Sequence, residues 1–320
     1  MKHNLKIVLV LLAMFVLTQF IGIYVIYSNP FTLETEIEGN ITIIDNPYLS
    51  WISPPSVETS QEFTSLFVFM IIAFLIAISV FILLMKTKIS SLIRIWFLFV
   101  IFTALSLSFI AFGKKTFFDA IGINLSFIII AILAISLAIV KVYKKSFIVH
   151  NFTELLIYPG IATLFVPILN IYTIIALLVI ISFYDMWAVW HSGIMQKMAQ
   201  YQINEVKIFS GFFVPYVSKK TKEKIKGWKK KLKKSELKKK KIKLNIAILG
   251  GGDIVFPIIT AGVMLKTLGL YSAILVILGS TLGLGYLFLR SEKKKFYPAM
   301  PFITSGILLA ILISYLFVWF

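Results

Sequence analysis

Two aspartates, Asp185 and Asp253, are the only acidic residues deep inside the long apolar stretches of this 320-residue chain. Placing a carboxylate in lipid costs several kcal/mol, so an intramembrane aspartate indicates a functional site. Two carboxylates that meet where the dielectric constant is low share one proton. The ionised one can act as a general base on water while the protonated one polarises a carbonyl. The pair predicts peptide-bond hydrolysis of the aspartic-protease kind.

The two aspartates are also matched in depth. Asp185 lies 12 residues before Lys197, and Asp253 lies 10 residues after Lys243. At about 1.5 Å per helical residue, each is roughly 15–18 Å along its helix from the nearest lysine. Because the two stretches are consecutive and antiparallel, we expect the carboxylates to face one another. The other acidic residues lie in polar connections or, like Asp119 and Glu154, near span ends, where we expect them to reach headgroups or water.

The residues around the aspartates suit this chemistry. Gly250-Gly251-Gly252 precedes Asp253 and removes side chains, so a substrate backbone can approach. The alternative is a glycine packing face with an incidental aspartate. Tyr184 precedes Asp185 and can supply a phenolic hydrogen bond. The segment 297–301 (YPAMP) can simply be a helix start with proline in its first turn.

Composition indicates what positions these residues. The chain is 59% hydrophobic and 14% charged, with a mean hydropathy of +0.93, and it has no cysteine and three histidines. Several apolar stretches reach the roughly 20 residues that cross a bilayer. We predict an all-α polytopic membrane protein without a metal site or thiolate nucleophile. Its nine predicted spans are 5–27, 63–85, 92–112, 117–140, 152–168, 170–196, 244–266, 268–289 and 296–319.

Basic residues predict the orientation. With the N-terminus in the cytoplasm, every lysine and arginine except Lys114, Lys115 and Lys266 lies on the cytoplasmic side, as the positive-inside rule requires. We therefore expect the N-terminus inside and the C-terminus outside.

The predicted division of the chain is 1–196 for the first six helices, with an outer loop at 28–62; 197–243 for a lysine-rich cytoplasmic loop; and 244–320 for the last three helices. Together they form one catalytic membrane domain. Residues 201–217 read either as an amphipathic segment on the inner membrane surface or as a docked loop.

Three ordered motifs resemble the presenilin/signal-peptide-peptidase family of GxGD intramembrane aspartyl proteases, and its archaeal presenilin-like members most of all. Tyr184-Asp185 matches the family's YD motif, and Gly250, Gly252 and Asp253 match GxGD. Pro298-Ala299 matches the PAL motif, with Met300 in place of leucine. The resemblance implies catalysis by Asp185 and Asp253, and substrate positioning by Tyr184, Gly250, Gly252, Pro298, Ala299 and Met300.

The resemblance also implies substrates that are transmembrane helices or signal-peptide remnants, a surrounding of membrane lipids, and no cofactor. We expect no nucleic-acid partner, no evident obligate subunit, and a prokaryotic cell membrane as the location. The substrate is expected to unwind and pair as a strand near the start of span seven and residues 298–300. The alternative function is a cation- or proton-coupled transporter that uses the paired carboxylates, although the sequence shows no internal repeat.

Overall fold

The computed structural model describes residues 5–37, 40–87, 90–114, 118, 121–144, 146–192, 210–216, 245–292 and 297–319. Within these ranges, nine helices are long and apolar enough to cross a membrane. A helix satisfies its backbone polar groups internally, which lipid cannot do. The polytopic helical prediction is thus confirmed. The helices are α1 (Leu5–Ser28), α2 (Ser60–Thr87), α3 (Ser90–Gly113), α5 (Ile123–Tyr143), α6 (Phe147–Phe165), α7 (Ile171–Trp187), α11 (Gly251–Leu268), α12 (Leu270–Arg290) and α13 (Met300–Trp319).

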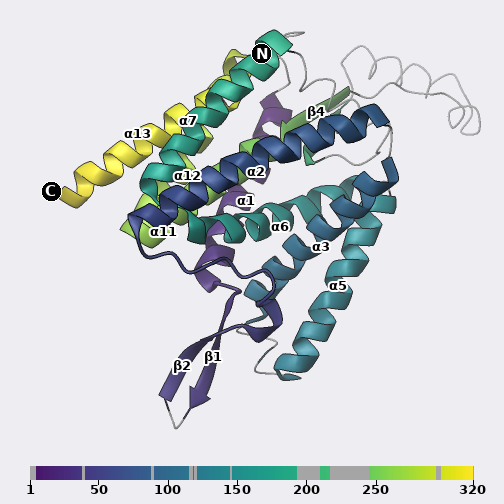
Figure 1. The fold of residues 1–320 in the computed structure, drawn as a ribbon. Helices are drawn as coiled ribbons and strands as arrows, with labels where there is room; N and C mark the ends of the chain where they lie inside the picture. The colour runs from purple at the N-terminus through teal and green to yellow at the C-terminus, as the bar shows by residue number, and fades with distance from the viewer. Residues whose placement is uncertain are drawn as a thin grey trace, which may run out of the picture.

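Two small antiparallel sheets interrupt the helical order, and the sequence analysis predicted neither. β1 (Thr32–Ile37) pairs with β2 (Asn40–Asp45), and β3 (Gly211–Tyr216) pairs with β4 (Asn245–Gly250). In Figure 1 the β1–β2 hairpin projects at the bottom of the molecule, whereas β4 lies at its upper end. The two sheets therefore extend from opposite ends of the helical body.

Two predicted spans include residues that are not α-helical. The span placed at 244–266 begins as a helix only at Gly251, because the six residues before it form β4. The span placed at 170–196 is α-helical to Trp187 and continues as a π-helical turn, Ala188–Ser192. Within the segment 201–217, residues 211–216 form a strand that packs against α1 and α6, which fits the docked interpretation. Residues 201–209 and 217 lie outside the described ranges.

The largest hydrophobic core lies among α1, α6, α7, α11, α12 and α13. α12 and α13 approach especially closely, since a Cβ at Gly279 or Gly283 would collide with the backbone of Gly306 or Phe302. Small residues at such crossings allow the backbones to touch, which is how helices associate in lipid. A second core joins α3, α5 and α6. α6 belongs to both clusters and connects them.

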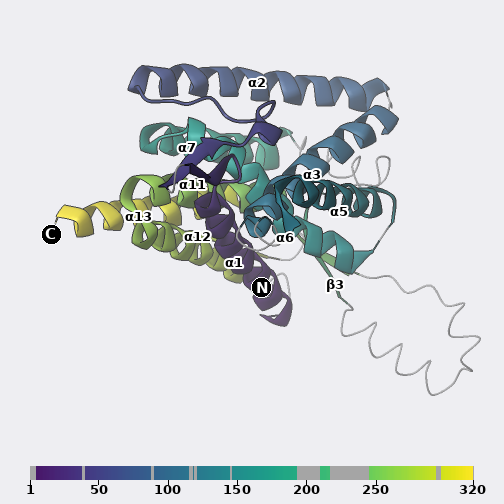
Figure 2. The same ribbon diagram turned by 90° about the horizontal axis from the view of Figure 1, so that it is seen from below.

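α2 differs from the other helices. None of the residues in its most apolar window is buried, and Figure 2 shows it along the top of the molecule, outside the remaining helices. Its contacts are with α3, α7 and the short 3₁₀ turn η2 (Val166–Ile168). Most of its apolar side chains therefore face outward, while Phe67, Met70 and Ile71 pack against the edge of the largest core.

Candidate active site

Asp185 lies in the last turn of α7 and is 6% exposed. Its Oδ2 accepts a hydrogen bond from the Met300 backbone N–H at 3.0 Å, and the Ala299 amide also faces the carboxylate. Met300 is the first residue of α13, so its N–H has no partner within that helix. A helix N-terminus stabilises a negative charge. The structure thus brings the segment 298–300 directly to Asp185.

Asp253 lies in the first turn of α11. It is close enough to Asp185 for the charges to interact, and its carboxylate also meets the Gly250 amide. α7, α11 and α13 pack against one another. One turn before Asp185, the Ser182 hydroxyl donates to Thr304 Oγ1 at 2.8 Å and ties α7 to α13. The two aspartates and the segment 298–300 therefore share one site.

The three glycines before Asp253 have different surroundings. A Cβ on Gly251 would lie only 2.9 Å from Tyr158 Oη and from Ser210 Oγ. A Cβ on Gly250 would lie 3.2 Å from Asp253 Oδ2, whereas one on the exposed Gly252 would meet nothing nearer than 3.7 Å. The tightest constraint falls on Gly251, which is the variable position of the motif. Gly252 leaves open space beside Asp253.

Tyr184 lies next to the site without a direct bond to it. Its side chain is half-buried, and its ring packs at a tilt against Trp187, with the centroids 6.3 Å apart. Within the described residues, its hydroxyl makes no hydrogen bond to Asp185 or Asp253. The phenolic hydrogen bond expected from the sequence is therefore not formed in this structure.

Gln19 is a site residue that the sequence analysis missed. It is fully buried in α1, and its Nε2 donates to the Ile254 carbonyl at 3.1 Å. Ile254 directly follows Asp253. α11 also contains Pro257, which has no N–H to bond the carbonyl four residues earlier. Gln19 thus stabilises a helix start that proline weakens. The signal was available, since a glutamine in an apolar span is unusual.

Glu154 contradicts its predicted place near headgroups or water. It is 1% exposed and pairs with Lys141 Nζ at 2.5 Å. α6 begins at Phe147, five residues before the predicted span, so Glu154 is about two turns inside the helix. Lys141, predicted for a cytoplasmic connection, lies within α5 and is also buried. Asp119 is outside the described residues.

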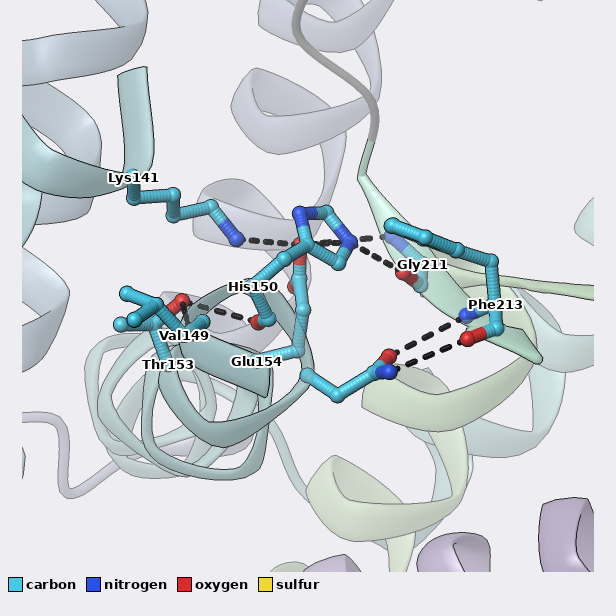
Figure 3. A network of polar contacts seen from close by, with 8 residues as sticks. Lys141, Val149, His150, Thr153, Glu154, Gly211 and Phe213 are labelled. Atoms are coloured by element: carbon cyan, nitrogen blue, oxygen red, sulfur yellow. Dashed lines mark hydrogen bonds and ion pairs between the residues drawn. The ribbon is translucent and has the colours of Figure 1, made fainter. Parts of the chain in front are cut away.

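The Glu154 region contacts β3. His150 Nε2 lies 2.8 Å from the Gly211 carbonyl, and the Gly211 N–H donates to Glu154 Oε1 at 3.4 Å. Asn151 binds both backbone groups of Phe213: it accepts from the N–H at 3.2 Å and donates to the carbonyl at 3.0 Å. Figure 3 shows Lys141 at the left, joined by a dashed line to Glu154 beside His150, with Gly211 and Phe213 at the right. We call Lys141, His150, Asn151 and Glu154 the strand clamp.

Comparison with known proteins gives a consistent result. A family model described as signal-peptide peptidase, presenilin aspartyl protease matches residues 47–319. A solved structure of a presenilin family intramembrane aspartate protease, in a C222 crystal form, superposes with a TM-score of 0.58 at 16% identity, covering 97% of this chain and 99% of that chain. A P2 crystal form gives 0.57 at 16% identity, with 96% of each chain covered. No curated protein sequence matches.

Proposed function

This chain belongs to the signal-peptide peptidase and presenilin family of intramembrane aspartyl proteases, and from that premise we propose that Asp185 and Asp253 are its catalytic pair. The observation that carries the proposal is the meeting of three distant segments at one place. Asp185 ends α7 and Asp253 begins α11, and these two helices pack against each other and against α13, where the Met300 amide binds Asp185. The transporter alternative gains no support from the family.

The proposed reaction uses one water and one shared proton. The Met300 N–H favours the ionised form of Asp185, because a hydrogen bond to a carboxylate stabilises its charge. Asp185 then takes a proton from the water, whose oxygen attacks the scissile carbonyl carbon. Asp253 holds the shared proton and donates it toward the carbonyl oxygen. Collapse of the tetrahedral intermediate breaks the C–N bond, and the departing amine receives a proton from the pair.

Substrate must reach this pair in an extended form, since a helix hides its amides in internal hydrogen bonds. β4 ends at Gly250, three residues before Asp253. Phe213 pairs with Ile248 in the sheet, and both backbone groups of Phe213 point to Asn151, away from β4. In an antiparallel ladder, the backbone N–H and carbonyl of the paired residue Ile248 then also point away from β3. The backbone groups of Ile246 and Ile248 thus form the free edge of β4, whereas the Gly250 amide meets the Asp253 carboxylate.

We propose that an unwound substrate strand adds to this β4 edge and ends beside the segment 298–300. Edge addition supplies partners for substrate backbone groups that lipid would leave unsatisfied. Gly252 keeps the approach to Asp253 open. Tyr184 and Gly250 line the same approach, while Pro298, Ala299 and Met300 hold Asp185 and the substrate on the other side.

The proposed orientation follows the basic residues. We propose that the N-terminus and the loop 197–243 lie in the cytoplasm of a prokaryotic cell, with the C-terminus outside, because almost all lysines then obey the positive-inside rule. The division into 1–196, 197–243 and 244–320 is kept as part of this proposal. Cleavage then falls in the inner half of the bilayer and favours single-span substrates whose N-terminus is outside.

The test is cleavage of a single-span substrate in proteoliposomes. We expect Asp185→Asn and Asp253→Asn each to abolish cleavage while the protein stays inserted and folded, since removing an intramembrane charge does not oppose insertion. The matched control is Asp45→Asn, the same change at an exposed position of β2, which should retain the wild-type rate. More than a trace of activity in either site variant rejects the pair.

A further inference from the structure

The strand clamp closes one edge of the β3–β4 sheet without using a third strand. Its side chains bind the N–H and carbonyl of Gly211 and those of Phe213. These are alternate residues of β3, so they form the edge that faces away from β4. The next residue on that edge is Pro215, which has no N–H to offer. An added strand therefore finds no free donor on β3.

The composition of the clamp is unusual for a feature that only stabilises the fold. Lys141 and Glu154 are 3% and 1% exposed, and burying such a pair is often no more stabilising than apolar packing of similar volume. Glu154 Oε1 receives both Lys141 and the Gly211 N–H. The ion pair thus fixes the carboxylate that holds the start of β3.

The same helix reaches the catalytic turn. Tyr158 lies one helical turn beyond Glu154, and its ring packs edge-on against Phe212 of β3, with the centroids 6.0 Å apart. Its hydroxyl lies over Gly251, where a Cβ would come within 2.9 Å. α6 consequently contacts Gly211, Phe212 and Phe213 of β3, and through Tyr158 it also contacts the turn that precedes Asp253. A shift of β3 on α6 would move β4 and the catalytic turn together.

We propose that the strand clamp is a positioning device that directs substrate to the β4 edge and sets which bond reaches the aspartates. Asn151 is its main positioning residue, since it alone satisfies both backbone groups of Phe213. This inference rests on the proposed function. It adds that α6, which supplies no catalytic group, determines the position of the cut.

The test compares Asn151→Leu with wild type in proteoliposomes, using a single-span substrate and mass spectrometry of the products. We expect at least a tenfold loss of kcat and products cut at more than one bond, two residues apart, because a strand repeats every two residues. Asn151→Asp keeps an acceptor for the Phe213 N–H but loses the donor to its carbonyl. We expect an intermediate spread of products from it.

Thr153→Val is the matched control. Thr153 is fully buried two residues away on the same helix, and its hydroxyl bonds only carbonyls of that helix, those of Val149 and His150. We expect wild-type rate and a single cut. Binding of a hydroxyl-containing aspartyl-protease inhibitor reports an intact catalytic pair and should be unchanged in all three variants.

Two results would overturn the inference. A single unshifted cut by Asn151→Leu and Asn151→Asp would mean that the clamp does not set the position of the cut. Loss of inhibitor binding in both variants would mean that the clamp only supports the fold. Failure of the proposed function gives a different result: Asp253→Asn would then still cleave the substrate, whatever products the clamp variants give.

Discussion

Two groups of carboxylates lie within the helices that the structure describes, and they have opposite surroundings. Glu154 has Lys141 at 2.5 Å. Asp185 and Asp253 have each other and backbone amides, and within the described residues no basic side chain forms an ion pair with either. A neighbouring cation favours the charged form of a carboxylate, whereas two carboxylates that meet can share and exchange one proton. The surroundings of an intramembrane acid therefore distinguish a positioning role from a catalytic one.

The largest effect on stability should come from removing one partner of the Lys141–Glu154 ion pair. Lys141→Met leaves Glu154 buried and uncompensated, which costs about 3–5 kcal/mol of unfolding free energy. The double variant Lys141→Met/Glu154→Met removes both charges and should recover most of that loss. Thermal unfolding in detergent measures both. A double variant as unstable as the single one would contradict the ion-pair account of Glu154.

The same measurement should separate the catalytic pair from the clamp. Asp253→Asn replaces the carboxyl group that holds the shared proton and leaves no cation without a partner, so we expect stability equal to or above that of wild type. A drop of unfolding temperature comparable to that of Lys141→Met would show that Asp253, like Glu154, serves the fold.

The next effect concerns the segment that holds Asp185. Ala299→Trp places a large ring where the backbone turns toward the carboxylate, and we expect about a 100-fold loss of kcat, equivalent to about 2.7 kcal/mol. Ser305→Ala is the control, because Ser305 is exposed on the same helix and bonds only the Pro301 carbonyl. Full activity of Ala299→Trp, and of Pro298→Leu, would reduce the segment to an ordinary helix start.

A smaller and graded effect is expected from pH. With both aspartates protonated there is no base, and with both ionised there is no acid. The rate at saturating substrate should therefore rise and then fall with pH, by up to about tenfold per pH unit on each limb. The measurement is kcat from about pH 4 to about pH 9. A flat profile would argue against a shared proton.

The smallest effect should be that of Tyr184→Phe. Because its hydroxyl bonds neither aspartate, its removal should cost about 1 kcal/mol or less, roughly a fivefold change in kcat/KM. Kinetics with the single-span substrate provides the test. A loss as large as that of Ala299→Trp would mean that the hydroxyl donates to the pair once substrate is bound.

The helical architecture could be predicted from sequence because lipid imposes a strong constraint. Apolar stretches of about 20 residues have few alternatives, and a charged residue inside one is conspicuous. The expected depth match of Asp185 and Asp253 needs correction, because it assumed a helix from Lys243 to Asp253. Asp253 lies in the first turn of α11 and β4 precedes it, so helical rise does not give its depth. The residues around the two aspartates were predicted from three sequence motifs, which lie at the expected spans.

The β3–β4 sheet could not be predicted in this way. The six residues of β4 read NIAILG and continue into an apolar helix, and a short apolar run does not distinguish a strand from a helix. Each residue of β4 pairs with a residue of β3 that lies 29 to 39 positions earlier, so only the tertiary structure shows the pairing. Glu154 was misplaced because the predicted start of α6 was five residues too late. The earlier start puts Glu154 about two helical turns inside the helix, where it forms a buried ion pair and does not reach headgroups.

The most direct test of the central claim is binding of a hydroxyl-containing transition-state inhibitor to purified wild type, Asp185→Asn and Asp253→Asn. The inhibitor hydroxyl takes the place of the attacking water between the carboxylates, so it needs both in their shared-proton state. We predict specific binding to wild type and to Asp45→Asn, and at least about a 100-fold weaker Kd for either site variant, which is about 2.7 kcal/mol. Wild-type affinity in either Asp185→Asn or Asp253→Asn would contradict the assignment of these two residues as the catalytic pair.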